Sequence, residues 1–154
     1  MAKVKVGIVG CGNISAIYFK AGETFEAFDI VACADLDLER AKQRAEEFNI
    51  PKACTVDELL ADPEIDIVVN LTIPAAHAEI AVAALEAGKH VYGEKPLAVT
   101  REEGKRILDL AERNGLLVGM SAKPGRLRIS PCRRVIHSSR RSIKRFLRFH
   151  AWAR

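Results

Sequence analysis

The sequence predicts an α/β protein built around a doubly wound parallel sheet. Through residues 1–120, short apolar segments typical of buried strands alternate with helical segments. The connections between them are short, and the helices begin and end at recognisable capping signals. A glycine-rich turn also follows the first strand, which is the arrangement of a Rossmann-type fold. We therefore expect helices on both faces of the sheet, and ligands at the carboxyl ends of its strands.

Five strands are expected, each a short apolar run suited to burial on both faces of a sheet. They are Val4–Val9, Phe28–Ala34, Ile65–Leu71, Lys89–Gly93 and Leu116–Gly119. The expected helices are Asn13–Ala21, Leu38–Phe48, a short helix after Thr55, Ala75–Ala87 and a helix from Thr100 to Asn114. Thr55 and Thr100 each open a helix with a capping box. Gly88 and Gly115 follow the ends of two helices, where a left-handed residue is favoured.

The composition is that of a globular protein. The 154 residues suffice for one core, and 49% are hydrophobic and 29% charged. No apolar run approaches the length of a membrane span, and the chain begins with a strand rather than a signal peptide, so we expect a cytoplasmic location. The cysteines stand far apart, which indicates reduced thiols and predicts neither a metal site nor disulfides. They are Cys11, Cys33, Cys54 and Cys132.

The turn after the first strand has the glycine spacing of a dinucleotide site. Gly10 permits a tight turn, Gly12 lets the backbone approach a pyrophosphate, and the small Ser15 suits close packing of helix on strand. The N–H groups at the helix start, from Asn13 and Ile14 onward, would face the phosphates. Similar glycines also occur in strand–turn–helix units that bind no ligand, so the turn alone does not decide between the two.

Asp35 follows the second predicted strand. A carboxylate there accepts hydrogen bonds from the adenosine ribose of NAD and repels the 2′-phosphate of NADP. Its separation from the glycines is slightly longer than the usual value of about 20 residues. Leu36 stands where an NADP enzyme often has arginine, which also favours NAD over NADP. The alternative is that Asp35 caps the next helix, a task that Asp37 could perform equally well. We favour the ribose role.

Two further motifs follow later strands. They are Asn70-Leu-Thr-Ile-Pro74-Ala-Ala-His77 and Glu94-Lys95-Pro96. Together with the glycine turn and Asp35, they resemble the N-terminal domain of the Gfo/Idh/MocA oxidoreductases, and the resemblance covers residues 3–120 nearly continuously. It implies NAD(P)-dependent hydride transfer between nicotinamide and a hydroxyl or carbonyl carbon, commonly of a sugar, a polyol or a related small molecule.

The resemblance also implies roles for single residues. Lys95 is the candidate catalytic residue, because an ammonium beside the reacting oxygen stabilises developing negative charge and can exchange a proton. Glu94 would orient Lys95, and a cis peptide would precede Pro96. The remaining cofactor contacts would come from Thr72, Pro74, His77, Glu94, Lys95 and Pro96. Two simpler interpretations stay open: Lys95 as a solvated surface lysine, and His77 as a packing or capping residue.

The net charge of +4 combines two opposite regions. Residues 1–120 hold all 20 acidic residues and 13 of the 24 Lys and Arg, whereas residues 121–154 hold the other 11 and no acid. The family's second α/β domain, which binds substrate and supplies acid–base residues, is not expected in so short and acid-free a segment. We predict a Rossmann domain over residues 1–120 and a poorly packed basic tail over residues 121–154.

Two interpretations of the tail remain. In the first, a basic amphipathic segment over Arg140–Ala151 binds nucleic acid or an acidic partner, and the chain is a non-catalytic NAD-binding or sensing module. In the second, the tail is truncated or frameshifted, because codons for Lys123–Leu127 permit a family-like Pro-Asp-x-Phe motif in another frame. An open sheet edge also allows a homo-oligomer. A small-molecule substrate would require that a second domain be supplied.

Overall fold

The computed structural model describes residues 3–121; residues 1–2 and 122–154, and with them the predicted basic tail, lie outside the described residues. The strands are β1 (Val4–Val9), β2 (Phe28–Ala34), β3 (Ala53–Cys54), β4 (Ile67–Asn70), β5 (His90–Gly93) and β6 (Val118–Met120). The helices are α1 (Ser15–Thr24), α2 (Leu38–Glu47), α3 (Val56–Ala61), α4 (His77–Glu86) and α5 (Arg101–Asn114), with a 3₁₀ turn η1 (Pro74–Ala76) before α4. None of these helices is long and apolar enough to cross a membrane.

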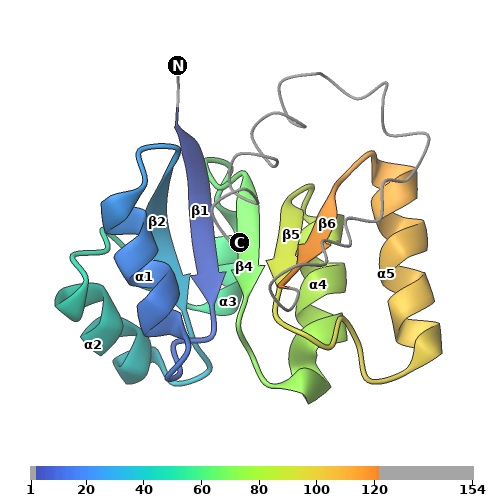
Figure 1. The fold of residues 1–154 in the computed structure, drawn as a ribbon, viewed down its shortest axis with the longest axis horizontal. Coiled ribbons are helices and arrows are strands. Elements are labelled where there is room, and N and C mark those ends of the chain that lie inside the picture. Colours follow the sequence, from blue (N-terminus) through green and yellow to red (C-terminus); the bar gives the residue numbers. More distant parts are fainter. Residues whose placement is uncertain (1–2, 122–154) are drawn as a thin grey trace.

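The strands form one parallel sheet in the order β3-β2-β1-β4-β5-β6 (Figure 1). The strand β1 pairs with β2 on one side and with β4 on the other, so the order along the sheet changes direction at β1. Helices α1 and α2 pack on one face, and α3, α4 and α5 pack on the other. This arrangement confirms the predicted doubly wound Rossmann-type fold, whose switch point lies at the carboxyl ends of β1 and β4.

Three differences from the sequence prediction have a clear physical reason, besides small shifts at the ends of other elements. The strand β3 is not predicted, because two residues are too few to show an alternation of apolar and polar side chains. Helix α1 begins at Ser15 rather than Asn13, since the residues just before it form the turn. The predicted helix Ala75–Ala87 is divided into η1 and α4, because proline at its start suits a tight first turn.

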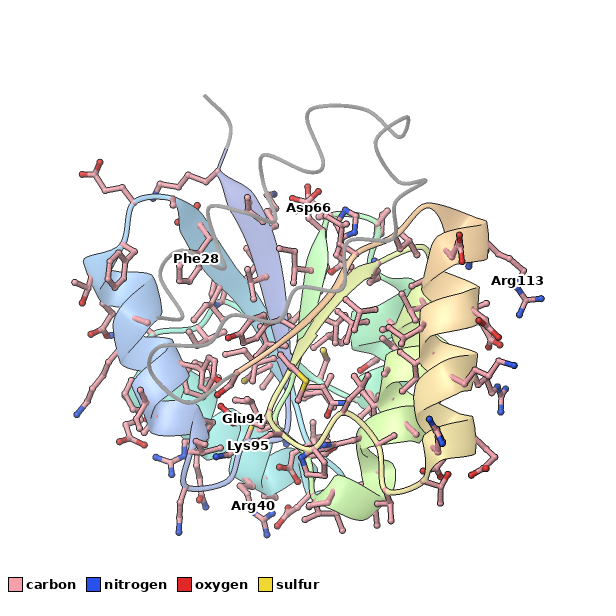
Figure 2. All side chains as sticks on the ribbon, turned by 45° about the vertical axis from the view of Figure 1, so that its right-hand side comes forward. Phe28, Arg40, Asp66, Glu94, Lys95 and Arg113 are labelled. Carbon is pink, nitrogen blue, oxygen red and sulfur yellow. The ribbon has the colours of Figure 1, made fainter. Side chains whose placement is uncertain are left out.

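Apolar side chains fill the space between the sheet and the helices on both faces (Figure 2). Those that hold α1 and α2 on the sheet include Val4, Val6, Ile8, Phe19 and Phe48. On the other face α3 approaches β1 closely, because an added Cβ at Gly7 would lie 2.9 Å from side-chain atoms of Leu59 and Ile65. Full burial of one large apolar side chain contributes about 1.5–3 kcal/mol, so this core fixes β1 firmly beneath its turn.

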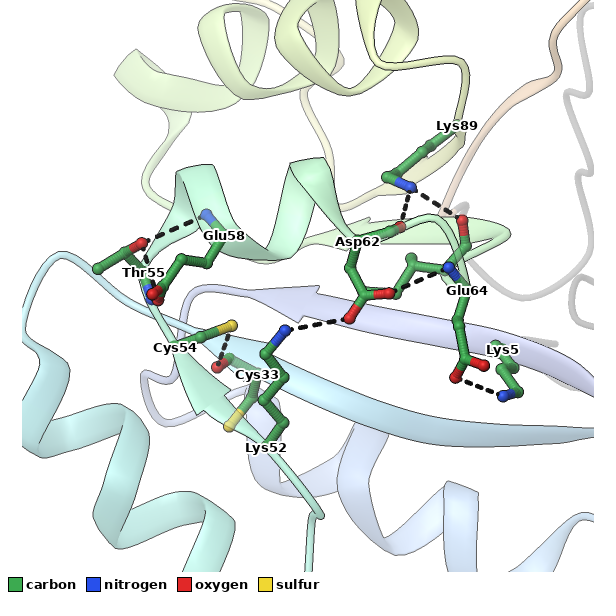
Figure 3. A network of polar contacts seen from close by, with 10 residues as sticks. Lys5, Cys33, Lys52, Cys54, Thr55, Glu58, Asp62, Glu64 and Lys89 are labelled. Atoms are coloured by element: carbon green, nitrogen blue, oxygen red, sulfur yellow. Dashed lines mark hydrogen bonds and ion pairs between the residues drawn. The ribbon is translucent and has the colours of Figure 1, made fainter.

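Polar side chains close the amino-terminal end of the sheet with contacts inside the protein (Figure 3). The buried Lys89 ammonium donates to the carbonyl oxygens of Asp62, at 2.5 Å, and Ile65, at 3.1 Å. Lys52 pairs with the Asp62 carboxylate at 3.1 Å, and Lys5 pairs with Glu64 at 2.7 Å. Burial lowers the pKa of Lys89 from its ordinary value. This end is therefore a polar scaffold whose donors and acceptors serve the fold.

Candidate functional site

All sequence-predicted site residues lie at the carboxyl ends of the strands. The loops after β1, β2, β4 and β5 carry Gly10, Gly12, Asn13, Ile14, Asp35, Thr72, Pro74, Glu94, Lys95 and Pro96, and His77 opens α4. Figure 2 shows Glu94, Lys95 and Arg40 at this end of the molecule, opposite Asp66 and Phe28. The structure thus brings together four loops that are far apart in the sequence.

The two glycines of the turn have different surroundings. Gly10 has a φ of 101°, and an added Cβ would lie 2.7–2.8 Å from backbone atoms of Leu71 and Thr72. Glycine is therefore required there both for the left-handed conformation and for the close approach of the loop after β4. Around Gly12, an added Cβ would meet nothing within 4 Å among the described residues. The turn consequently leaves space next to its backbone at Gly12.

The start of α1 is built for close packing and has no side-chain cap. The Ser15 side chain is fully buried, and its hydroxyl donates to the Gly12 carbonyl at 2.6 Å. This serine holds the turn against the helix, which explains why a small residue is needed. The N-cap residue Ile14 forms no side-chain cap, so the helix keeps its positive N-terminal end toward the turn.

Asp35 ties the glycine turn to the loop after β2. Its Oδ2 accepts a hydrogen bond from the Cys11 N–H at 2.7 Å, and its Oδ1 accepts one from the Asp37 N–H at 3.0 Å. The Arg40 guanidinium lies 3.4 Å from Oδ1, and the Asp35 side chain is only 9% exposed. Asp37, and not Asp35, caps α2, with its carboxylate accepting from the N–H groups of Glu39 and Arg40. The capping role is therefore filled without Asp35.

Asn70 shapes the loop after β4. Its Nδ2 donates to the His77 carbonyl at 2.9 Å, and its Oδ1 accepts from the Thr72 hydroxyl at 2.7 Å and from the Thr72 N–H at 3.3 Å. Sequence reasoning did not single out this side chain as functional. The signal that could have found it is a polar residue at the end of a buried apolar strand.

His77 connects two of the loops. The residue is 4% exposed, and its ring places Nδ1 2.6 Å from the Pro96 carbonyl oxygen and Nε2 2.9 Å from the Thr72 carbonyl oxygen. Both oxygens only accept hydrogen bonds, so a neutral ring donates to one of them at a time. The peptide between Lys95 and Pro96 is cis, as predicted. His77 thus connects the loops after β4 and β5 through the backbone carbonyls that it contacts, as the packing interpretation expects.

Lys95 and Glu94 make different contacts from those expected. The Lys95 side chain is exposed, and within residues 3–121 its ammonium has no hydrogen bond or ion pair. Glu94 accepts a hydrogen bond from the Tyr18 hydroxyl of α1. The contact to Glu94 therefore comes from Tyr18, a residue that the sequence shows only as an apolar position of a helix. Lys95 is left as an exposed cation without a polar partner among residues 3–121.

Exposed apolar side chains surround this end of the sheet. Ile14, Leu36 and Ile73 belong to three different loops, and their exposed fractions are 40%, 100% and 70%. Exposure of a whole leucine side chain is unfavourable by roughly 1.5–3 kcal/mol relative to burial. Apolar groups that converge with a few polar ones are typical of a ligand site.

Comparison with known proteins shows the family. Residues 4–122 match the GFO_IDH_MocA family, described as "Oxidoreductase family, NAD-binding Rossmann fold". The chain belongs to the Gfo/Idh/MocA oxidoreductases. Residues 4–122 are therefore an NAD(P)-binding oxidoreductase domain, as the glycine turn and the later motifs predict.

Individual relatives and solved structures match about three quarters of the chain. Inositol 2-dehydrogenase of Salmonella typhimurium is 34% identical over 115 residues, which are 73% of this chain and 34% of that protein. KijD10, a 3-ketoreductase from Actinomadura kijaniata in complex with NADP and TDP-benzene, is 33% identical with a TM-score of 0.72, over 77% of this chain and 37% of that one. GenD2 from gentamicin A biosynthesis, in complex with NAD, is 26% identical with a TM-score of 0.73, over 78% and 34%. The chain spans about a third of the length of these relatives.

Proposed function

We propose that residues 3–121 bind NAD(H) across the loops at the carboxyl ends of the strands, as the dinucleotide domain of a dehydrogenase or reductase. The tie between Asp35 and the glycine turn is the observation that carries this proposal. The carboxylate has about four acceptor positions, and its contacts to Cys11, Asp37 and Arg40 use three. A ribose hydroxyl can donate to the remaining position while the turn stays in place.

Each loop is proposed to contact a different part of the dinucleotide. Open space beside Gly12 and the uncapped start of α1 suit a pyrophosphate, which would contact Gly10, Gly12, Asn13 and Ile14. The exposed Leu36 and Ile73 suit the two sides of an adenine. The nicotinamide half would lie toward the segments that carry Thr72, Pro74, His77, Glu94, Lys95 and Pro96. The residues present therefore fit a dinucleotide.

We propose NAD rather than NADP as the preferred cofactor. Asp35 and Asp37 place two carboxylates beside the proposed ribose position, where a 2′-phosphate would be repelled. Arg40 is a cation within the same group, but it already pairs with Asp35 at 3.4 Å and with Asp37 at 3.7 Å. GenD2 is solved with NAD and KijD10 with NADP, so the family accommodates either cofactor.

The proposed chemistry is hydride transfer to or from a carbonyl or hydroxyl carbon of a sugar, polyol or related molecule. The nicotinamide, when bound, would carry the hydride. Lys95 would stabilise negative charge on the substrate oxygen and exchange a proton with it, and its exposed ammonium supports this role. The names of the inositol dehydrogenase and the 3-ketoreductase support the substrate class. A further domain would supply the substrate pocket in the complete protein.

Calorimetry with the full chain tests the cofactor proposal directly. We expect NADH to bind more tightly than NADPH, and Asp35→Ala to weaken NADH binding by about tenfold, the loss of one hydrogen bond to a charged group. Asp29→Ala is the matched control, because Asp29 lies at the opposite end of β2 and, within residues 3–121, its carboxylate pairs with the exposed Lys3. If the full chain binds neither NADH nor NADPH, the proposal is contradicted.

A second candidate function is a non-catalytic NAD-binding or sensing module. It is favoured by the charge contrast, since residues 121–154 carry 11 basic residues and no acid. This proposal predicts association with nucleic acid or an acidic partner that weakens with salt and is lost when residues 121–154 are removed. The frameshift interpretation predicts no such association, and the nucleotide sequence of the gene tests it independently.

We also propose that the protein is cytoplasmic and able to self-associate. Cys11, Cys33 and Cys54 are buried free thiols in the structure, which suits a reducing compartment. Self-association would cover the edge of the sheet at β3 or β6. Cell fractionation and sedimentation of the purified chain test these two points.

A further inference from the structure

A hydrogen bond joins helix α1 to the segment that carries Lys95. The Tyr18 hydroxyl donates to Oε1 of Glu94, although the two residues are 76 positions apart in the sequence. Tyr18 lies within the first turn of the helix that follows the glycine turn, and its side chain is buried. Glu94 directly precedes Lys95, and Figure 2 shows both beside α1. The contact therefore links the pyrophosphate side of the proposed site to the nicotinamide side.

The Tyr18 hydroxyl is a permanent donor. Burial raises the pKa of Tyr18, and the hydrogen bond to the Glu94 carboxylate raises it further. The hydroxyl consequently keeps its proton throughout the physiological pH range. A phenol that neither loses its proton nor reaches the exposed Lys95 ammonium is unsuited to proton transfer. The Tyr18 hydroxyl is therefore suited to positioning Glu94 rather than to proton transfer.

The segment from Glu94 to Pro96 is held at both ends by groups from other elements. At one end, the Glu94 side chain accepts from Tyr18, and the Glu94 N–H donates to the Asn70 carbonyl at 3.3 Å. At the other end, the Pro96 carbonyl oxygen lies 2.6 Å from Nδ1 of His77. Lys95 stands between these two anchors, with its side chain exposed. Release of either anchor would let the Lys95 backbone move.

We propose that Tyr18 is a positioning residue that couples occupancy of the glycine turn to the placement of Lys95. The inference rests on the proposed function, because it requires a dinucleotide that touches both α1 and Lys95. The pyrophosphate would fix the start of α1, α1 carries Tyr18, and Tyr18 holds Glu94 and hence the backbone of Lys95. By linkage, a correctly placed Lys95 segment also favours dinucleotide binding.

Removal of the Tyr18 hydroxyl should weaken NADH binding about fivefold, at the low end of typical couplings between sites. Tyr18→Phe keeps the ring and its packing. Glu94→Ala should give a similar loss, and the double variant should be no weaker than either single one, because each removes the same contact. Glu94→Gln keeps an oxygen acceptor for the Tyr18 hydroxyl and should restore most of the affinity. Thr24→Ala is the control, since it removes an exposed hydroxyl from the other end of α1.

A second measurement follows Lys95 itself. In the full chain, acetic anhydride labels exposed lysines, and mass spectrometry quantifies each labelled peptide. We expect NADH to protect Lys95 at least fivefold in the wild type and much less in Tyr18→Phe, even at NADH concentrations that saturate both proteins. Lys20 is the internal reference, because it is an exposed lysine of α1 beyond the turn. A purely structural role for Tyr18 would lower the melting temperature and leave saturated protection unchanged.

The outcomes separate this inference from the proposed function. If the wild type binds neither NADH nor NADPH, both are overturned. If the wild type binds NADH but the losses in Tyr18→Phe and Glu94→Ala are additive, or protection of Lys95 is equal in wild type and Tyr18→Phe, the cofactor proposal stands and the coupling is overturned. Non-additive losses together with weakened protection are the expected result.

Discussion

Two lysines that flank the same strand, β5, have opposite environments. Lys89 precedes the strand, and its buried ammonium donates to the carbonyl oxygens of Asp62 and Ile65. Lys95 follows the strand, and within the described chain its exposed ammonium has no such partner. Only a few residues separate the two, so strand position, and not local composition, determines which lysine serves the fold and which is available to a ligand.

The same contrast holds for the two ends of the sheet. At the amino-terminal end, charged side chains pair with other charged side chains of the protein (Figure 3). At the carboxyl-terminal end, Gly12 borders open space, and Leu36 and Ile73 expose apolar surface. Parallel strands place all their carboxyl ends on one edge, so the loops there converge and can share one ligand. Substitutions at matched positions test this division.

The largest effect is expected within the glycine turn. Gly10→Ala should lower the free energy of unfolding by about 3 kcal/mol, because a left-handed non-glycine residue and an overlap with backbone each cost about 1–3 kcal/mol. Gly12→Ala should change it by less than about 0.5 kcal/mol, since the added methyl meets open space. Gly12→Ala should instead weaken NADH binding at least tenfold. Urea unfolding and calorimetry measure the two quantities, and equal destabilisation by both variants would contradict this assignment.

The two lysines provide the next comparison. Lys89→Met should lower the free energy of unfolding by about 2 kcal/mol, because two backbone carbonyls lose a charged donor while the apolar stem is kept. Lys95→Met should change it by less than about 0.5 kcal/mol. Urea unfolding of the full chain measures both. A Lys95→Met variant as unstable as Lys89→Met would show that Lys95 also serves the fold.

A smaller effect is expected on cofactor choice. Asp35→Asn should reduce the ratio of NADH to NADPH affinity by about tenfold, or about 1.4 kcal/mol, because the carboxylate no longer repels a 2′-phosphate. The ratio is informative because weakening of the hydrogen bond between the Cys11 N–H and the residue 35 side chain lowers the affinity for both cofactors equally. Asp29→Asn, at the other end of β2, should leave the ratio unchanged. Competition binding with the two dinucleotides measures it, and an unchanged ratio in Asp35→Asn would remove Asp35 as the source of the NAD preference.

The sequence predicts what short-range patterns encode. The strand–helix alternation, the glycine turn and the capping boxes at Thr55 and Thr100 depend on residues within a few positions of each other, and all are present. The strand β3 is missed because its position depends on pairing with β2 rather than on its own two residues. Contacts between distant residues are missed for the same reason. The Tyr18–Glu94 hydrogen bond and the contact of His77 with Pro96 exist only because the sheet brings helices and loops from distant parts of the sequence together.

The smallest effect concerns pH and the amino-terminal end. His90 is buried, and its Nδ1 accepts a hydrogen bond from the Leu117 N–H at 3.0 Å, which requires an unprotonated nitrogen. Burial lowers the pKa of His90 below its ordinary value of 6.5, although the nearby Asp66 charge acts in the opposite direction. Well above pH 6.5 the ring is neutral in the folded and unfolded chains alike.

As the pH falls below 6.5, the unfolded chain binds a proton at His90 before the folded chain does, so stability decreases until the lowered folded pKa is reached. His90→Asn keeps an acceptor near the position of Nδ1 but cannot titrate. Thermal unfolding from pH 7.5 to 5.0 should therefore show a steeper loss of stability in the wild type than in His90→Asn. Parallel curves would mean that His90 has the same pKa in the folded and unfolded chains. The amino-terminal end of β5 would then be more accessible to solvent than its contacts indicate.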